Sequence, residues 1–260
     1  MIRRLILLLS MVVASPALAQ IPQWNPAAPY ITAGQDEPGY RAWVAQANWR
    51  PAYVKAFHDY LTTYGVGGVA PTWQLLRTAT DWQKCGAEPY EVPPPNAWPN
   101  IVAALRYVGT YVTPRVGPIE VVSVYRNNRL NACAGGAPES THKLMGAVDL
   151  VPLNPITREA LMTRLCQIHR ESGERFWIGL GLYKGIRFHI DAKKFREWGM
   201  SGAQGGFGCA AVLAEGPMPM PVAPPDFAGV PMTSPPSSRE PQAFIFRTVP
   251  PAPDPPKPHN

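Results

Sequence analysis

Residues 140–149 read STHKLMGAVD, and the fold of the central part of the chain is expected to depend on this stretch. It leaves a loop rich in Gly, Pro and Ser and enters an apolar, strand-like segment. His142 would offer a ring nitrogen from the loop, and Asp149 a carboxylate from the start of the strand. A third ligand is available in residues 188–191, FHID, which contain His189. Two histidines and one carboxylate are the protein ligands of many catalytic zinc sites, which leave the fourth position to water.

The first residues are typical of a secretory signal peptide. Arg3 and Arg4 form a charged end, residues 5–13 an apolar core, and residues 17–19, Ala-Leu-Ala, a small-residue cleavage site. The apolar core is too short to cross a bilayer as a helix, and no other stretch is long and apolar enough for a membrane span. We therefore expect cleavage near Ala19 and a mature chain that is periplasmic or secreted.

The four cysteines are an even number, which in an exported chain predicts two disulfides. Three pairings are possible, and we favour Cys85–Cys133 together with Cys166–Cys209. Their wide spacing includes no C-x-x-C pair, which argues against a zinc–thiolate cluster.

The net charge of the chain is +6 with neutral histidines, and two of these charges are the signal-peptide arginines. The remaining mild excess suits an anionic cell-wall polymer as a partner. It is far below the excess that marks nucleic-acid binding, and no run of lysine and arginine is present. We therefore expect no nucleic-acid partner, and the sequence leaves the oligomeric state open.

Residues 20–114 are expected to form an N-terminal helical segment packed on the core. Residues 20–39 show no clear period and predict an extended arm. Apolar residues follow helical spacing from Pro51 onward, across 71–82 and across 98–112, with proline suited to a first helical turn.

Residues 115–215 are expected to form the core domain. A loop is predicted over 126–141, a helix over 155–172, and residues 196–199 should close the domain. Four stretches are rich in β-branched or alternating apolar residues, which predicts strands; they are 119–125, 147–153, 176–183 and 186–191. Helices followed by strands predict an α+β fold, with a small antiparallel sheet and helices packed on it.

Residues 216–260 differ in composition from the rest of the chain. The last 44 residues contain 15 of the 32 prolines. Such a segment cannot bury enough apolar surface to fold alone, which predicts a disordered, proline-rich tail.

Several short motifs between residues 118 and 200 together resemble the zinc D-Ala-D-Ala metallopeptidases. This family includes D-Ala-D-Ala carboxypeptidases and murein endopeptidases and shares its fold with the hedgehog signalling domain. The matching motifs are SVYR at 123–126, GG at 135–136, S-x-H-x6-D at 140–149, GLGLY at 179–183, H-x-D at 189–191 and Trp198.

The resemblance implies a zinc cofactor, with His142, Asp149 and His189 as its ligands. It also implies that the substrate is a peptide stem of peptidoglycan, cut by a zinc-activated water molecule. Whether the cut removes a terminal D-Ala or opens a crosslink is left open by the sequence.

The resemblance also implies roles for residues around the metal. Arg126 matches the arginine that binds the substrate carbonyl and stabilises the oxyanion, because a guanidinium is always charged. Ser140 matches a serine that hydrogen-bonds the substrate, and Tyr125 is expected to contribute to substrate binding. Asp191 would orient His189 from behind, as carboxylates do for metal-bound imidazoles.

The chain departs from the family pattern at the general base. Many relatives carry an acid three residues before the last histidine ligand, or a histidine two residues before it. Here these positions are Ile186 and Arg187, neither of which can accept a proton. Asp191 is then the candidate base, with Glu139 from the loop as a weaker one.

Two other functions are compatible with the sequence. A zinc- or peptidoglycan-binding module of the same fold would have weakened catalysis, as the missing acid suggests. A disulfide-stapled structural protein of the wall would carry the histidine and aspartate pattern by coincidence.

Overall fold

The computed structural model describes residues 25–199 and 208–214. The predicted signal peptide, 1–19, and the proline-rich tail, 216–260, lie outside the described residues. The chain divides into two units, Met1–Met220 and Pro221–Asn260, and every described residue belongs to the first.

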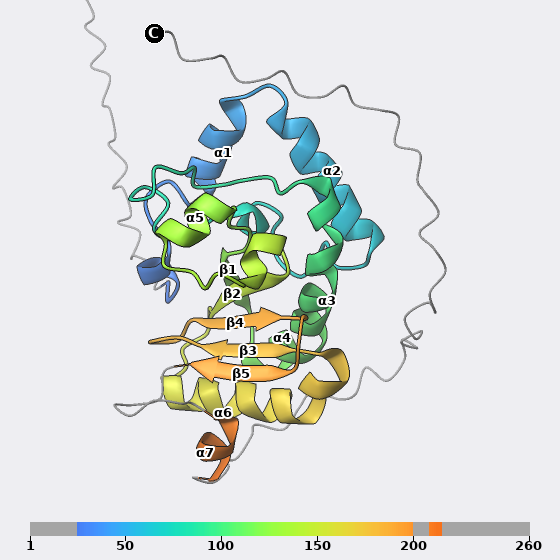
Figure 1. Cartoon of the computed structure of the whole chain (residues 1–260), viewed down its shortest axis with the longest axis vertical. Coiled ribbons are helices and arrows are strands. Elements are labelled where there is room, and N and C mark those ends of the chain that lie inside the picture. The colour runs from blue at the N-terminus through green and yellow to red at the C-terminus, as the bar shows by residue number, and fades with distance from the viewer. Residues whose placement is uncertain (1–24, 200–207, 215–260) are drawn as a thin grey trace, which may run out of the picture. The chain divides into compact units, whose positions relative to one another are not determined.

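The described part has an α+β fold built on a mixed five-stranded sheet, shown in Figure 1. The strands lie in the order β1-β2-β4-β3-β5. Their bounds are β1 Ile119–Ser123, β2 Ala147–Pro152, β3 Gly179–Leu182, β4 Phe188–Asp191 and β5 Arg196–Gly199. The first four strands lie where the sequence predicts strands, and each is shorter than its predicted range.

The prediction of a purely antiparallel sheet is wrong, because β5 pairs in parallel with β3. Both edges of β4 are already hydrogen-bonded, to β2 and to β3. The chain that follows Asp191 therefore cannot form a hairpin with β4. It passes to the free edge of β3, where Arg196 pairs with Gly179. Residues 196–199 thus extend the sheet.

The N-terminal part contains helices α1, Glu37–Ala45, and α2, Arg50–Thr63. The second confirms the helix predicted from Pro51. The first replaces the end of the predicted arm. Its start is fixed by Asp36, whose side chain accepts a hydrogen bond from the backbone N–H of Gly39.

The helix predicted over residues 71–82 is wrong. The structure has a single 3-10 turn, Gln74–Leu76, after which Arg77 forms an extended bridge with Tyr90. The fully buried Arg77 side chain donates to the carbonyls of Gln35 and Val121 and pairs with Glu120. These long-range bonds outweigh the local helical preference, although the apolar side chains of this segment are buried as expected.

The predicted helix over 98–112 is α3, Pro99–Tyr107, continued by a π-helical turn at Val108–Val112. A short helix, α4, spans Thr113–Val116. The predicted helix over 155–172 is α6, Arg158–Ile168, continued by a π-helical turn at His169–Gly173. The predicted loop 126–141 contains a helix, α5, Asn128–Cys133, which is capped by Asn127.

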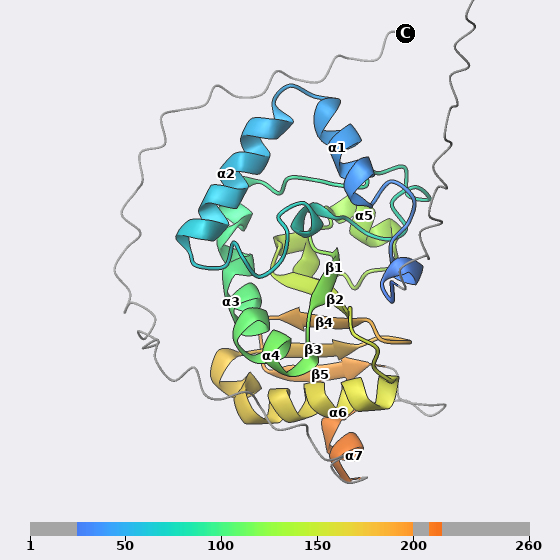
Figure 2. The same ribbon diagram turned by 180° about the vertical axis from the view of Figure 1, so that it is seen from behind.

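One face of the sheet lies on the main hydrophobic core, and the other carries polar side chains together with a small apolar cluster of Ala27, Val122 and Val151. Along β2, β3 and β4, alternate side chains enter the hydrophobic core, which α3 and α6 help to form; they are Val148, Leu150, Leu180, Leu182, Phe188 and Ile190. Because side chains alternate along a strand, residues 149, 181 and 189 point to the opposite face. Figure 2 shows the same elements from behind.

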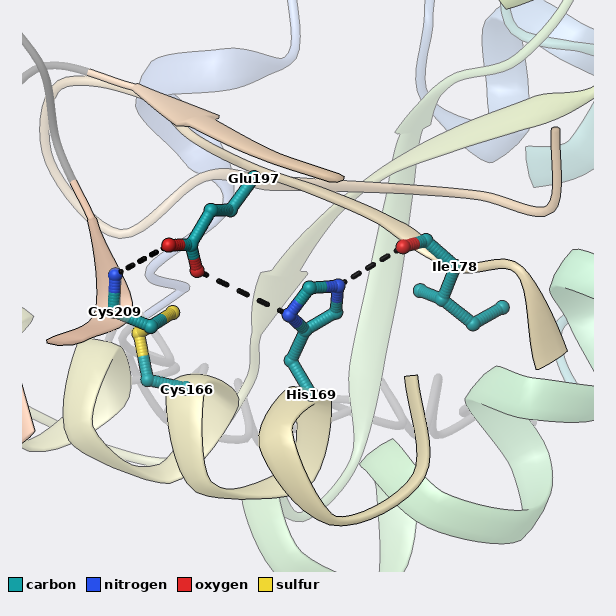
Figure 3. Close-up of a disulfide and its surroundings, with 5 residues drawn as sticks. All are labelled: Cys166, His169, Ile178, Glu197 and Cys209. Atoms are coloured by element: carbon teal, nitrogen blue, oxygen red, sulfur yellow. Dashed lines mark hydrogen bonds and ion pairs between the residues drawn. A yellow bond between two sulfur atoms is a disulfide. The ribbon is translucent and has the colours of Figure 1, made fainter. Parts of the chain in front are cut away.

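Both predicted disulfides are confirmed. Cys85–Cys133 joins the loop after Leu76 to α5, and Cys166–Cys209 joins α6 to α7, Cys209–Ala214. The second bond is shown in Figure 3, where Glu197 of β5 accepts a hydrogen bond from the backbone N–H of Cys209 at 2.9 Å. Helix α7 is therefore attached to both α6 and the sheet.

Candidate metal centre

The three predicted ligands come together on the polar face of the sheet. His142 lies in a 3-10 turn, Thr141–Leu144, directly before β2, whereas Asp149 and His189 lie on the strands β2 and β4. Asp149 and His189 are directly paired across these strands, which puts their side chains side by side on one face.

Three donor atoms face one another at hydrogen-bond distance. Oδ1 of Asp149 lies 3.2 Å from Nε2 of His142 and 2.9 Å from Nδ1 of His189. The two ring nitrogens are 3.1 Å apart. All three side chains are buried, with at most 4% of the side chain exposed. They form a group that can hold a metal ion.

The outer contacts of the two rings select the tautomer of each. Nδ1 of His142 faces the backbone carbonyl of Val124, which can only accept, so this nitrogen carries the proton. Nε2 of His189 lies 3.0 Å from Oδ2 of Asp191 and carries the proton for the same reason. The inner nitrogens of both neutral rings are therefore unprotonated. Their lone pairs face each other and a carboxylate oxygen of Asp149.

Three converging lone pairs repel one another unless a cation or a proton lies among them. The pattern of one donor nitrogen inside and one N–H bonded outside is the pattern of metal-bound histidines, whose second nitrogen donates to a carboxylate or a backbone carbonyl. The donor chemistry of the site therefore suits a metal ion.

The pKa values around the site show a strongly coupled group. Burial lowers the pKa of His142 to about 4. Burial also opposes the charged form of His189, but hydrogen bonds to Asp149 and Asp191 outweigh it and raise its pKa. Burial raises the pKa of Asp149, and the Arg187 guanidinium with His142 and His189 reverses this and holds it well below the usual range. A proton on His189 is thus the competitor of a metal ion.

Asp191 lies behind His189 and is fully buried. Its oxygens accept from the His189 ring, from the backbone N–H of Lys193 and from Arg196. These contacts suit the orienting role predicted for Asp191. As a base it would need access to the pocket, and Asp191 itself is not among the described residues that line the pocket.

Two glycines of β3 make room for these groups. A side chain at Gly179 would lie 2.5 Å from Oδ2 of Asp191, and one at Gly181 would lie 2.6 Å from the Trp198 ring. Trp198 in turn packs edge-on against His189, with ring centroids 4.9 Å apart. The glycines in GLGLY are therefore explained by the close approach of Asp191, His189 and Trp198.

A pocket of about 530 Å³ is lined by His142 and His189, whereas the fully buried Asp149 is not part of its wall. Its wall includes Arg126 and Ser140, as predicted, and also Gly135 and Gly136 of the loop. Tyr125 is half-buried and is not part of this wall, and its contact with substrate stays a prediction.

Arg126 is held close to His142 by a backbone hydrogen bond, from its N–H to the His142 carbonyl at 3.2 Å. Only 9% of its surface is exposed, and its Nε is buried without a hydrogen-bond partner among the described residues. A buried guanidinium on a pocket wall is a site for a negatively charged or polar oxygen.

Four further ionisable residues line the pocket without having been predicted to act there: Asp81, Tyr183, Arg187 and Arg196. Tyr183 lies in the GLGLY motif, and Arg187 was noted as a departure from the family pattern. Asp81 has no motif around it. Its neighbours Ala79 and Thr80 also line the pocket, and Cys85, four residues later, is bonded to Cys133, next to the glycine loop.

The weaker base candidate, Glu139, is exposed and also lines the pocket. Glu139 and Asp81 are the acidic residues of the pocket wall. Each comes from a loop: Asp81 precedes Cys85 in the sequence, and Glu139 follows Cys133.

A second group, His169, Glu197 and Cys209, also brings potential ligand atoms together. Figure 3 shows that Cys209 is bonded to Cys166, so its sulfur is not a free thiolate. Nε2 of His169 donates to the carbonyl of Ile178, and Nδ1 lies 4.0 Å from Glu197. This group therefore connects the turn that follows α6 with the residue before β3 and with β5.

Comparisons with protein-family models, curated proteins and solved structures found no match for this chain. Among the described residues, no helix has the length and apolarity needed to cross a membrane. The two disulfides are consistent with an extracytoplasmic protein.

Proposed function

We propose that the chain is an exported zinc metallopeptidase that hydrolyses peptide stems or crosslinks of bacterial peptidoglycan that contain D-amino acids. The observation that carries this proposal is the set of three inward lone pairs on His142, Asp149 and His189, beneath a pocket walled by Arg126 and Ser140. The disulfides and the signal-like first residues support a periplasmic or secreted location.

Zinc fits the donor set. Zinc bonds of about 2.0–2.2 Å to nitrogen and oxygen put two ligand atoms of a tetrahedral site roughly 3.3–3.6 Å apart. The three observed separations are 2.9–3.2 Å, so an outward shift of a few tenths of an ångström would accommodate the ion. Three protein ligands facing a pocket are typical of catalytic rather than structural zinc sites.

Bound there, zinc would supply the Lewis acidity that makes hydroxide available from water at neutral pH. The Arg126 guanidinium would bind the scissile carbonyl and stabilise the negative charge that grows on its oxygen. The Ser140 hydroxyl would donate a hydrogen bond to a carboxylate or peptide group of the same stem. Trp198 and Asp191 would hold the His189 ring in place.

The proton from water must reach the leaving amine. Glu139 is the carboxylate best placed for this step, because it is exposed, lines the pocket and lies one residue before Ser140. Asp81 lines the same pocket and is the other carboxylate available. Asp191 would not carry this proton, because it is hydrogen-bonded to the His189 ring.

The proposal is tested by incubating the purified protein with purified sacculi and analysing the released muropeptides by mass spectrometry. The zinc-loaded protein should release shortened or uncrosslinked stems. A His142→Ala variant and the chelated native protein serve as controls and should release none. Failure of the zinc-loaded native protein to cleave any stem would refute the enzymatic function.

A second function, a zinc- or peptidoglycan-binding module with weakened catalysis, is favoured by one observation. Ile186, at the position where the resembled family carries the acid, packs against the apolar cluster of Ala27, Val122 and Val151. This function predicts that the loaded protein co-sediments with sacculi and leaves their stems intact. Stoichiometric zinc that is lost in His142→Ala would exclude a purely structural wall protein.

A further inference from the structure

The two oxygens of Asp149 have different partners. Oδ1 faces the inner nitrogens of His142 and His189. Oδ2 accepts a hydrogen bond from Nη2 of Arg187, and the two side chains form an ion pair. Asp149 is completely buried, and Arg187 is about four-fifths buried. The site therefore already contains a cation that neutralises its carboxylate.

Arg187 is itself held in one position. Its guanidinium lies over the Tyr183 ring, 4.8 Å from the ring centroid, a cation–π contact. The Tyr183 hydroxyl lies 3.3 Å from Oδ1 of Asp149. Tyr183 and Arg187 face each other across the β3–β4 hairpin, where the N–H of Tyr183 donates to the carbonyl of Arg187 at 3.2 Å. The two residues that flank the turn of the hairpin thus reach the same carboxylate.

We propose that Arg187 is a positioning residue of the metal centre, which occupies Oδ2 of Asp149 so that Oδ1 alone is presented to the metal. This inference rests on the metal-binding part of the proposed function. Without Arg187, the carboxylate is free to turn about its last bond and present both oxygens. The planar, fixed fork of a guanidinium suits such an orienting task better than a flexible ammonium group.

The same pair lets the site form before a metal binds. A buried carboxylate without a partner is strongly destabilising, whereas a buried ion pair with hydrogen bonds is tolerated. Asp191 likewise forms an ion pair with Arg196, with Nη2 2.8 Å from Oδ2. Both carboxylates of the site therefore have an arginine partner in the metal-free protein, and the donor atoms stand ready.

Cobalt substitution tests the proposal, because the intensity of the visible absorption of Co²⁺ reports the number of ligands. The variants are Arg187→Met, which removes the charge and the fork, and Arg187→Lys, which keeps the charge. Arg115→Met is the matched control, since Arg115 forms an ion pair with Glu171 at the surface, away from the site. Thermal unfolding of each protein is measured without metal and with saturating Co²⁺.

The native protein and Arg115→Met should bind one equivalent of Co²⁺ with the same spectrum. Arg187→Met should give a weaker absorption, as Asp149 adds its second oxygen, and its Tm should fall in the metal-free form and recover in large part with Co²⁺. Arg187→Lys should show the same changes to a smaller extent.

A native spectrum in every Arg187 variant that folds and binds Co²⁺ would overturn the proposal. If Arg187→Met does not fold, the spectrum of Arg187→Lys decides alone. A native protein that binds no Co²⁺ would instead contradict the metal centre itself, so the two failures are distinguishable.

Discussion

Nε2 of His142 and Nδ1 of His189 lie 3.1 Å apart. The proton of each ring lies on its outer nitrogen, Nδ1 of His142 and Nε2 of His189, because these atoms face acceptors. Two neutral imidazoles facing each other in this way make no hydrogen bond. With Oδ1 of Asp149 beside them, they form a concentrated site of lone pairs in the protein interior. The predictions below follow from this arrangement.

Removal of either histidine should abolish tight zinc binding. We expect His142→Ala and His189→Ala to weaken zinc affinity by more than about 100-fold, since loss of a supporting residue alone typically costs 10–100-fold. His58→Ala is the control, because His58 is exposed on α2 and bonded to Thr72. Affinity is measured by competition with a chelator. Equal affinity in the native protein and His142→Ala would exclude His142 as a ligand.

Zinc affinity should rise with pH and then level off. In the metal-free protein the pKa of His189 is raised and that of His142 is lowered to about 4. Below the pKa of His189, zinc must displace one proton, so affinity should change about tenfold per pH unit. Above it, both rings are neutral and the dependence should vanish. Calorimetry in buffers of different ionisation enthalpy counts the released protons, and none released near pH 6 would contradict this assignment.

Acid should also destabilise the metal-free protein through His142. Its pKa is about 4 in the folded state, against 6.5 for a free histidine side chain, so the unfolded chain takes up this proton first. The stabilisation is complete above pH 6.5 and is lost as the pH falls toward 4. His142→Gln should flatten this part of the curve of unfolding free energy against pH, measured by denaturant titration. A curve of unchanged slope would show that His142 titrates normally.

Asp191→Asn should weaken zinc binding without abolishing it. The amide keeps the shape of the carboxylate but holds the His189 proton less firmly, which predicts an affinity loss of about 10–100-fold. The pH profile of any peptidase activity should keep its shape, because Asp191 orients His189 and does not carry the proton. Disappearance of one limb of the profile would instead identify Asp191 as the base.

Arg126→Met should separate chemistry from metal binding. Zinc affinity should stay close to native, because Arg126 does not contact the donor atoms through its side chain. Cleavage of peptide stems should fall about 10²–10³-fold in kcat, the usual cost of one lost oxyanion-binding group. Activity close to native would remove Arg126 from the mechanism.

The sequence predicted that His142, Asp149 and His189 come together, because the three residues lie in local patterns that survive folding. Asp149 and His189 were each placed on a strand, and adjacent antiparallel strands bring such residues together. The helix from Pro51 and both disulfide pairings were likewise confirmed. The roles of these residues in catalysis stay predictions.

Other features depend on contacts distant in the sequence and left no local signal. Arg77 has helix-favouring neighbours, yet its bonds to Gln35 and Val121, more than 40 residues away, hold it extended. The parallel position of β5 follows from both edges of β4 being occupied. Asp81 lines the pocket in a segment held by long-range contacts, such as the hydrogen bond from Gln35 to the Ala79 carbonyl. By contrast, the start of α1 did have a signal, the capping Asp36 followed by Pro38, which the irregular composition of residues 20–39 obscured.

The most direct test of the metal centre is a crystal structure of the zinc-loaded protein with anomalous data collected at the zinc edge. We expect one strong peak about 2.0–2.2 Å from Nε2 of His142, Nδ1 of His189 and Oδ1 of Asp149, with Oδ2 still bonded to Arg187. A peak bonded to the outer nitrogens, or zinc bound elsewhere with these three atoms empty, would contradict the account.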